Sequence, residues 1–85
     1  MPKYIDYHKK LPPLPPEAVK MMKDKLGSKK ADQFGVVALS SFITKDSQGW
    51  CVTEAPNADA VCKSHEPMGL KLSKGDVHEL MMSLP

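Results

Sequence analysis

The chain contains no arginine: all 12 of its basic residues are lysine, and 10 acidic residues are interspersed among them. Arginine is the side chain that contacts guanine and phosphate through two parallel hydrogen bonds. The net charge is only +2, and the lysines do not gather into one basic run. The composition therefore excludes nucleic acid as the expected partner, and the lysines are interpreted as a solvated surface.

Long apolar runs are also missing. No stretch reaches the length of about 18 apolar residues that a membrane-spanning helix needs, and no charged-then-apolar signal stands at the N-terminus. The two cysteines, Cys51 and Cys62, are too few for the multi-bridge framework of a small secreted domain. We therefore expect a cytoplasmic protein that does not contact a membrane and whose cysteines are reduced thiols.

A single domain over residues 1–85 follows from the length. A chain this short buries only roughly 60–65% of its unfolded surface, so its own core is marginal. Association into a homodimer would bury more apolar area.

Six elements follow one another along the chain. Strands are expected where β-branched and aromatic residues cluster, helices where apolar residues recur every three to four positions, and boundaries at glycine and proline. The expected elements are a strand over residues 3–8, a helix over 16–34, paired strands over 36–45 and 50–55, a helix from the Asn57 cap to about Glu66, and a strand over 76–82.

This order of strand, helix, strand, strand, helix, strand is the ferredoxin-like βαββαβ pattern of the α+β class. It predicts a four-stranded antiparallel sheet with two helices on one face. The other face of the sheet is left open, and we expect a homodimer to form through it.

The first strand carries a carboxylate and an imidazole two residues apart. Asp6 and His8 point to the same face, about 7 Å apart along the backbone. They suit a metal or acid–base site, and they equally suit a surface pair at a strand end. His65 is the last residue of the apolar stripe on the second expected helix. It is either a histidine at the edge of the core, with its polar ring atoms in water, or a ligand. His78 lies in the last expected strand, where a solvent-facing position is the more common one.

The order and spacing of short motifs make the chain similar to a known family. The matching parts are MPKYIDYH at the start, Phe34-Gly35-Val36, Cys51 with Glu54-Ala55-Pro56, Ala60-Val61 followed by His65, Gly69-Leu70, and residues 76–80. They resemble a small family of bacterial and archaeal proteins of unknown function, and the resemblance covers most of the chain.

The resemblance implies a ferredoxin-like fold, a dimer and a divalent-metal site, because the family includes a described nickel-binding member. The matching candidate ligands are Asp6, His8, Glu54, His65 and His78, with Cys51 ranked below the histidines. The chain departs from the family where members often carry a histidine in the first helix, since Met21, Met22 and Lys23 stand there. A site that requires that histidine would be absent.

Three functions stay open at this point. The first is metal binding, with nickel favoured by the resemblance, although no metal-ligand signature such as C-x-x-C or H-x-x-x-H is present. The second is an enzyme or small-molecule binder whose pocket on the open sheet face is lined by Tyr4, Asp6, His8 and Trp50. The third is a structural or regulatory module that docks through the proline-rich loop over residues 9–16.

Overall fold

The computed structural model describes residues 1–84, and it contains four strands, two α-helices and two short 3-10 helices. In chain order these are β1 (Lys3–His8), α1 (Pro16–Ser28), β2 (Val37–Ile43), β3 (Gly49–Glu54), α2 (Ala58–His65), η1 (Glu66–Met68), η2 (Lys74–Asp76) and β4 (Val77–Glu79).

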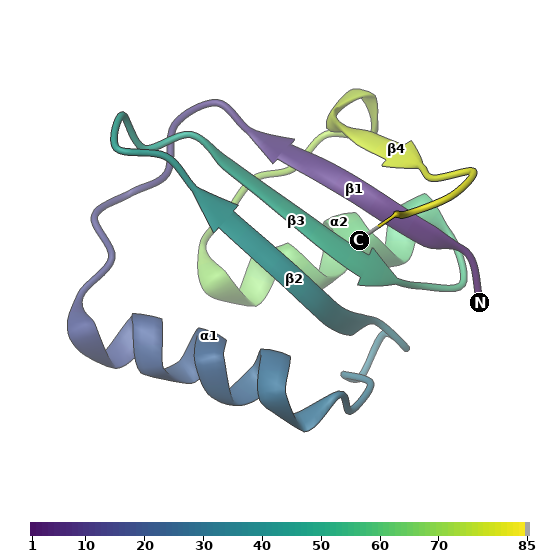
Figure 1. The fold of residues 1–85 in the computed structure, drawn as a ribbon, viewed down its shortest axis with the longest axis horizontal. Helices are drawn as coiled ribbons and strands as arrows, with labels where there is room; N and C mark the ends of the chain where they lie inside the picture. Colours follow the sequence, from purple (N-terminus) through teal and green to yellow (C-terminus); the bar gives the residue numbers. More distant parts are fainter. Residues whose placement is uncertain (85) are drawn as a thin grey trace.

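The four strands form one antiparallel sheet in the order β2-β3-β1-β4, with β1 and β3 in the centre. Both α-helices lie on the same side of this sheet, and its other side carries no helix (Figure 1). This is the ferredoxin-like α+β architecture that the order of elements predicts, and the prediction is confirmed. None of the helices in residues 1–84 is long and apolar enough to cross a membrane.

The strands agree with the sequence analysis at the centre of the sheet and are shorter at its edges. β1 has the expected bounds and β3 is displaced by one residue. β2 ends at Ile43 and contains a bulge between Ala38 and Ser40, which shifts its register against β3. The expected strand over residues 76–82 is wrong in length: Asp76 belongs to η2 and β4 covers three residues.

The first helix is also shorter than expected, because it ends at Ser28 and not at Phe34. Lys29 adopts a left-handed conformation with φ of 55°, which stops an α-helix. The Ser28 hydroxyl reinforces this end by donating to the Lys25 carbonyl and accepting from the Lys30 amide. Helix periodicity in the sequence does not detect such a local side-chain stop.

The second helix begins where the sequence predicts. The Asn57 side chain accepts a hydrogen bond from the Ala60 amide at 2.8 Å, and Asp59 stands in the first turn. The helix ends at His65, one residue before the expected Glu66, and Pro67 continues it as η1. Its buried face holds Val61 and His65.

Asp32 ties the loop between α1 and β2 to α2. Its Oδ1 accepts from the backbone amides of Phe34 and Val36, and its Oδ2 accepts from the Ser64 hydroxyl. The Lys25 ammonium lies 3.7 Å from the same Oδ2. Because Ser64 precedes His65, this carboxylate fixes the end of the helix that carries the histidine.

The apolar core is small and lies between α2 and the central strands. It consists of Tyr4, Val36, Ala55, Ala60, Val61 and Val77. α1 contributes no buried residue and contacts mainly β2. One side of the molecule is therefore packed by α2, whereas the side beneath α1 is loosely filled.

We predict that Asp32→Ala lowers the free energy of unfolding by about 1–3 kcal/mol, because the buried Val36 amide and the Ser64 hydroxyl lose their acceptor. Chemical denaturation with circular dichroism measures this loss. Asp24→Ala on the exposed face of α1 is the matched control and should change stability by less than about 0.5 kcal/mol.

The effect of Asp32→Ala should also depend on pH. Partial burial raises the pKa of Asp32, but the hydrogen bonds from Ser64 and two backbone amides, together with Lys25, hold it below its ordinary value. A carboxyl group with a lowered pKa stabilises the fold above its unfolded pKa of about 3.9, and this contribution is lost as pH falls through the folded value. The difference between wild type and variant should therefore shrink below about pH 4. A difference that stays constant into strong acid would contradict this role.

Candidate metal centre

Asp6 is the residue around which the site is built. It lies in the middle of the central strand β1, directly opposite Cys51 of β3 and Val77 of β4, and its side chain is completely buried. Tyr4 and His8 share its face and are buried as well. The expectation that Tyr4, Asp6 and His8 face the open side of the sheet is wrong: they point toward the helices, because this is the face on which α2 packs.

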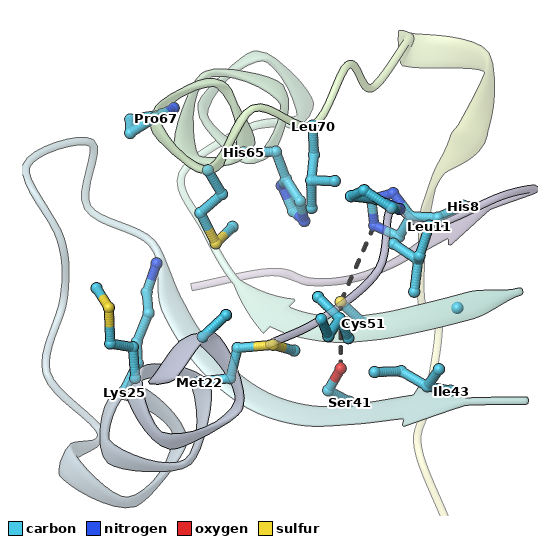
Figure 2. Close-up of a pocket in the computed structure, with 16 residues that line it drawn as sticks. His8, Leu11, Met22, Lys25, Ser41, Ile43, Cys51, His65, Pro67 and Leu70 are labelled. Carbon is cyan, nitrogen blue, oxygen red and sulfur yellow. Dashed lines mark hydrogen bonds between the residues drawn. The ribbon is translucent and has the colours of Figure 1, made fainter. Parts of the chain in front are cut away.

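Two histidines and a cysteine surround the Asp6 carboxylate. The Nε2 atom of His8 lies 2.7 Å from Asp6 Oδ1, and the Nε2 atom of His65 lies 3.5 Å from the same oxygen. The sulfur of Cys51 lies 4.0 Å from His8 Nε2. Figure 2 shows His65 descending from its helix toward His8 and Cys51 on the sheet.

The four donor atoms form one compact cluster. Asp6 Oδ, His8 N, Cys51 Sγ and His65 N all lie within 4.8 Å of one another. The imidazole rings of His8 and His65 are 5.0 Å apart between centroids and tilted by 39°. Residues from β1, β3 and α2, far apart in sequence, thus direct one carboxylate, two imidazoles and one thiol at one point.

His65 is held in a defined orientation by its helix. Its Nδ1 lies 2.8 Å from the Val61 carbonyl oxygen, so this nitrogen carries the proton and donates it. Its Nε2 is then free to present a lone pair toward Asp6. A histidine that donates from one ring nitrogen to a backbone carbonyl and offers the other nitrogen is the usual arrangement of a metal ligand.

No well-aligned hydrogen bond reaches the Asp6 carboxylate in the described part of the chain, although the Nε2 atom of His8 lies 2.7 Å from it. Both of its oxygens are buried, and neither accepts a hydrogen bond. The contact with His8 is short enough for an ion pair, but it lacks hydrogen-bond alignment. Burying a carboxylate in this way is costly unless a charge compensates it. The imbalance therefore indicates a cation at this point, either a protonated histidine or a metal ion.

The protonation states of the cluster are strongly coupled. Contact with the Asp6 carboxylate, followed by contact with the Cys51 thiol, raises the pKa of His8 to about 9 against the effect of burial. Burial raises the pKa of Cys51, but its interactions with His65 and His8 outweigh burial and lower it to about 7.

Burial lowers the pKa of His65, whereas Cys51 and the Val61 carbonyl raise it, and the net shift is upward. In the metal-free protein an imidazolium of His8 therefore compensates the buried carboxylate near neutral pH.

The donor set suits a transition metal. Two imidazole nitrogens, one thiolate and one carboxylate are ligands of zinc, nickel, cobalt and copper. Bond lengths of about 2.0–2.3 Å place tetrahedral ligand atoms about 3.3–3.8 Å apart. The 3.5 Å between His65 and Asp6 and the 4.0 Å between Cys51 and His8 lie close to this spacing. The 2.7 Å between His8 Nε2 and Asp6 Oδ1 is shorter, so these two atoms would separate if both bound one ion. Small side-chain movements would complete the coordination.

His8 does not have the position of the base in a nucleophilic relay. In a cysteine–histidine–aspartate relay, the carboxylate orients one ring nitrogen and the other nitrogen takes the thiol proton. Here both Asp6 and Cys51 approach the Nε2 atom of His8. Two groups that approach the same nitrogen atom of His8 have the arrangement expected around a shared cation. They do not have the arrangement in which His8 relays a proton from Cys51 to Asp6.

Two of the candidate ligands lie outside the cluster. Glu54 stands opposite Lys3 at the other end of β3 and points to the face opposite Cys51. His78 stands opposite Ile5 and is exposed on the open side of the sheet. The antiparallel register separates Glu54 from His8 by the length of the strand, so these side chains cannot meet.

The expected pocket pair is also separated. Tyr4 belongs to the core beneath the sheet, whereas Trp50 stacks on Tyr7 at 5.0 Å on the open face. Cys51, in contrast, belongs to the cluster although the sequence analysis ranks it below the histidines. Strand alternation predicts that Cys51 and Thr53 share a face, but it does not say that Asp6 lies opposite Cys51; that follows only from the register.

A cavity of about 460 Å³ opens directly beside the cluster. His8, Cys51 and His65 line one end of it, and the rest is lined mainly by apolar side chains of α1, β2, η1 and the proline-rich segment, with Lys25 and Ser41 among them. Figure 2 shows Met22 and Leu11 on opposite sides of this space. The cluster is consequently buried from bulk water yet reachable through an apolar chamber.

Comparisons with known proteins identify the fold and no function. No protein-family model matches the chain, and no curated protein is detectably similar in sequence. The crystal structure of SCO4226 from Streptomyces coelicolor A3(2) is similar, with a TM-score of 0.70 and 21% sequence identity. The match covers 96% of this chain and 99% of that chain. At this identity the likeness establishes the shared fold alone.

Proposed function

We propose that the protein binds one divalent transition-metal ion through Asp6, His8, Cys51 and His65. The observation that carries this proposal is the buried Asp6 carboxylate, which accepts no hydrogen bond and is approached by two histidine Nε2 atoms. A divalent ion would neutralise the carboxylate and the Cys51 thiolate together, leaving both imidazoles neutral.

Nickel is the ion we favour among the candidates. The donor set admits zinc, copper and cobalt as well, so the preference rests on the family resemblance described for the sequence. A thiolate ligand also requires a reducing compartment such as the cytoplasm, and both Cys51 and Cys62 are free thiols. We propose metal handling as the role, since Asp6 and Cys51 both approach the Nε2 atom of His8.

Calorimetric titration of chelator-stripped, untagged protein with nickel and then zinc tests the proposal. We expect one site per chain with micromolar or tighter affinity. His65→Ala should weaken binding at least tenfold, because it removes a ligand whose orientation the Val61 carbonyl fixes. His78→Ala is the matched control, since this histidine is exposed on the other sheet face, and it should leave the affinity unchanged.

Metal affinity should rise with pH between about 6 and 8. His8, with a pKa raised to about 9, must lose its proton to bind, and so must the Cys51 thiol. Binding should accordingly release protons, which titrations in buffers of different ionisation enthalpy measure. Absence of metal binding, or an equal loss of metal affinity in the His78→Ala and His65→Ala variants, would contradict the proposal.

We also propose that two copies associate through the open sheet face. Tyr7, Trp50 and Phe42 form an aromatic row across β1, β3 and β2, with Phe42 60% exposed. Ile5 and Val52 extend the row beside it. Apolar area of this kind on a small domain is typical of a subunit interface.

Phe42→Lys should convert the dimer into a monomer in sedimentation velocity experiments, because it places a charge on the most exposed member of the aromatic row, at its β2 end. Met21→Lys is the control, since Met21 is 72% exposed on α1 beneath the other side of the sheet, and it should leave the dimer intact. A wild-type protein that stays monomeric at high micromolar concentration would overturn this second proposal.

A further inference from the structure

The cavity beside the metal cluster is too large to be an ordinary packing defect. Its volume is about 460 Å³, whereas protein interiors hold few voids larger than a water molecule. Small-molecule sites are clefts of about 300–1,000 Å³ with mainly apolar walls and a few polar groups at one point. The chamber matches this description in volume, in lining and in its single polar end.

The chamber exists because α1 contacts the edge strand β2 and does not pack on the central strands. No residue of this helix is buried, although Ala18 and Met22 are half-buried and line the chamber. Figure 1 shows α1 at a distance from β1 and β3, at the end of the long proline-rich connection. Most of the stability of a protein helix comes from packing of its apolar face. The apolar face of α1 therefore lacks the partner that would normally cover it.

The proline-rich segment forms another wall of the same chamber. Leu11, Pro12 and Leu14 line it, and the Leu11 amide is anchored to the Ser47 carbonyl at 2.8 Å. Prolines keep this wall extended and stiff. The segment thus holds α1 at a set distance from the sheet, which gives the proline run a role inside this chain.

The polar groups of the chamber specify the head group of an occupant. His8, Cys51 and His65 lie at one end, and Lys25 is the only side chain with a fixed charge in the lining drawn from residues 1–84. No aspartate or glutamate of this described part lines the chamber, since Asp6 lies behind the histidines. Lys25 already lies 3.7 Å from Asp32, so the case for an anionic head group rests on the lack of carboxylates in this described lining and on the metal proposed for the cluster, since a carboxylate is a ligand that transition metals accept.

We propose that the chamber binds a linear medium-chain carboxylate, with its apolar tail beneath α1 and its head group directed at the metal in the cluster. The assignment of the carboxylate head group rests on the proposed metal function. The assignment of the apolar tail rests on the chamber alone. Asp6, His8, Cys51 and His65 would hold the ion, and the carboxylate head group would reach it from the chamber that His8, Cys51 and His65 line.

A chain-length series tests the assignment. Hexanoate, octanoate and decanoate are titrated calorimetrically, below their micelle concentrations, into nickel-loaded and metal-free protein. Affinity should rise by about fourfold for each methylene that enters the chamber, and decanoate should bind the nickel-loaded form more tightly than the metal-free form. Decanol should bind the nickel-loaded form at least tenfold more weakly than decanoate, because it lacks the anionic head.

Variants of the chamber wall locate the binding. Ala18→Trp fills the chamber and should weaken decanoate binding at least tenfold while nickel affinity stays unchanged. Lys20→Trp places the same side chain on the exposed side of the same helix and should have no effect. Leu14→Asp serves as a second variant in the loop, where it alters no helix or strand and repels the carboxylate.

The outcomes separate the two proposals. Decanoate binding that Ala18→Trp abolishes in a protein that binds no nickel would support the chamber and overturn the metal function and the head-group assignment. Nickel binding with no affinity for any acid would overturn the chamber proposal alone. Equal affinity for decanol and decanoate would overturn the carboxylate head. Loss of the dimer in Ala18→Trp would identify a second copy of this chain as the occupant and overturn the proposal.

Discussion

The buried carboxylate of Asp6 is the constraint on which the rest of this structure depends. It stands in the central strand, with β3 and β4 on either side and a helix above, and its oxygens accept no hydrogen bond. A charge in this environment destabilises the fold unless another charge lies against it. Two histidines and a cysteine converge on it, so either an imidazolium or a metal ion fulfils this requirement.

A separate feature of the fold positions each of these groups. Antiparallel register sets Cys51 opposite Asp6, and strand alternation puts His8 on the same face. The Asn57 cap fixes where α2 begins, and the hydrogen bond from Ser64 to Asp32 fixes where it ends. His65 is thereby aimed at the sheet. α1 supplies no ligand, and its distance from the sheet leaves the cluster open to an apolar chamber.

The sequence predicts the local elements well because their signals are local. The Asn57 cap and the alternation of β1 appear where expected, and α2 ends within one residue of the expected position. The helix stop at Lys29 and the short β4 are missed, since a left-handed residue and the pairing of an edge strand leave no periodic pattern. Asp6, His8 and His65 are identified as candidates from residue type alone.

The arrangement of the site requires tertiary information. The sequence does not specify the strand register, which decides that Asp6 meets Cys51 and not Glu54, or which sheet face the helices cover, which decides that this pair is buried. The strand register also places His78 away from the cluster. The chamber is likewise invisible in the sequence, because an amphipathic α1 predicts a helix packed onto the sheet and not one held apart from it. The tertiary structure therefore determines which candidate residues form the site, whereas local sequence patterns identify only the candidates.

X-ray absorption spectroscopy of the nickel-loaded protein tests the central claim most directly, because it counts the donor atoms around the ion. The account predicts one sulfur from Cys51 together with nitrogen and oxygen donors from His8, His65 and Asp6, and loss of the sulfur contribution in Cys51→Ser. A spectrum with only nitrogen and oxygen donors, unchanged by that substitution, would contradict it. The ion would then lie elsewhere, and the buried carboxylate would be compensated by a protonated histidine alone.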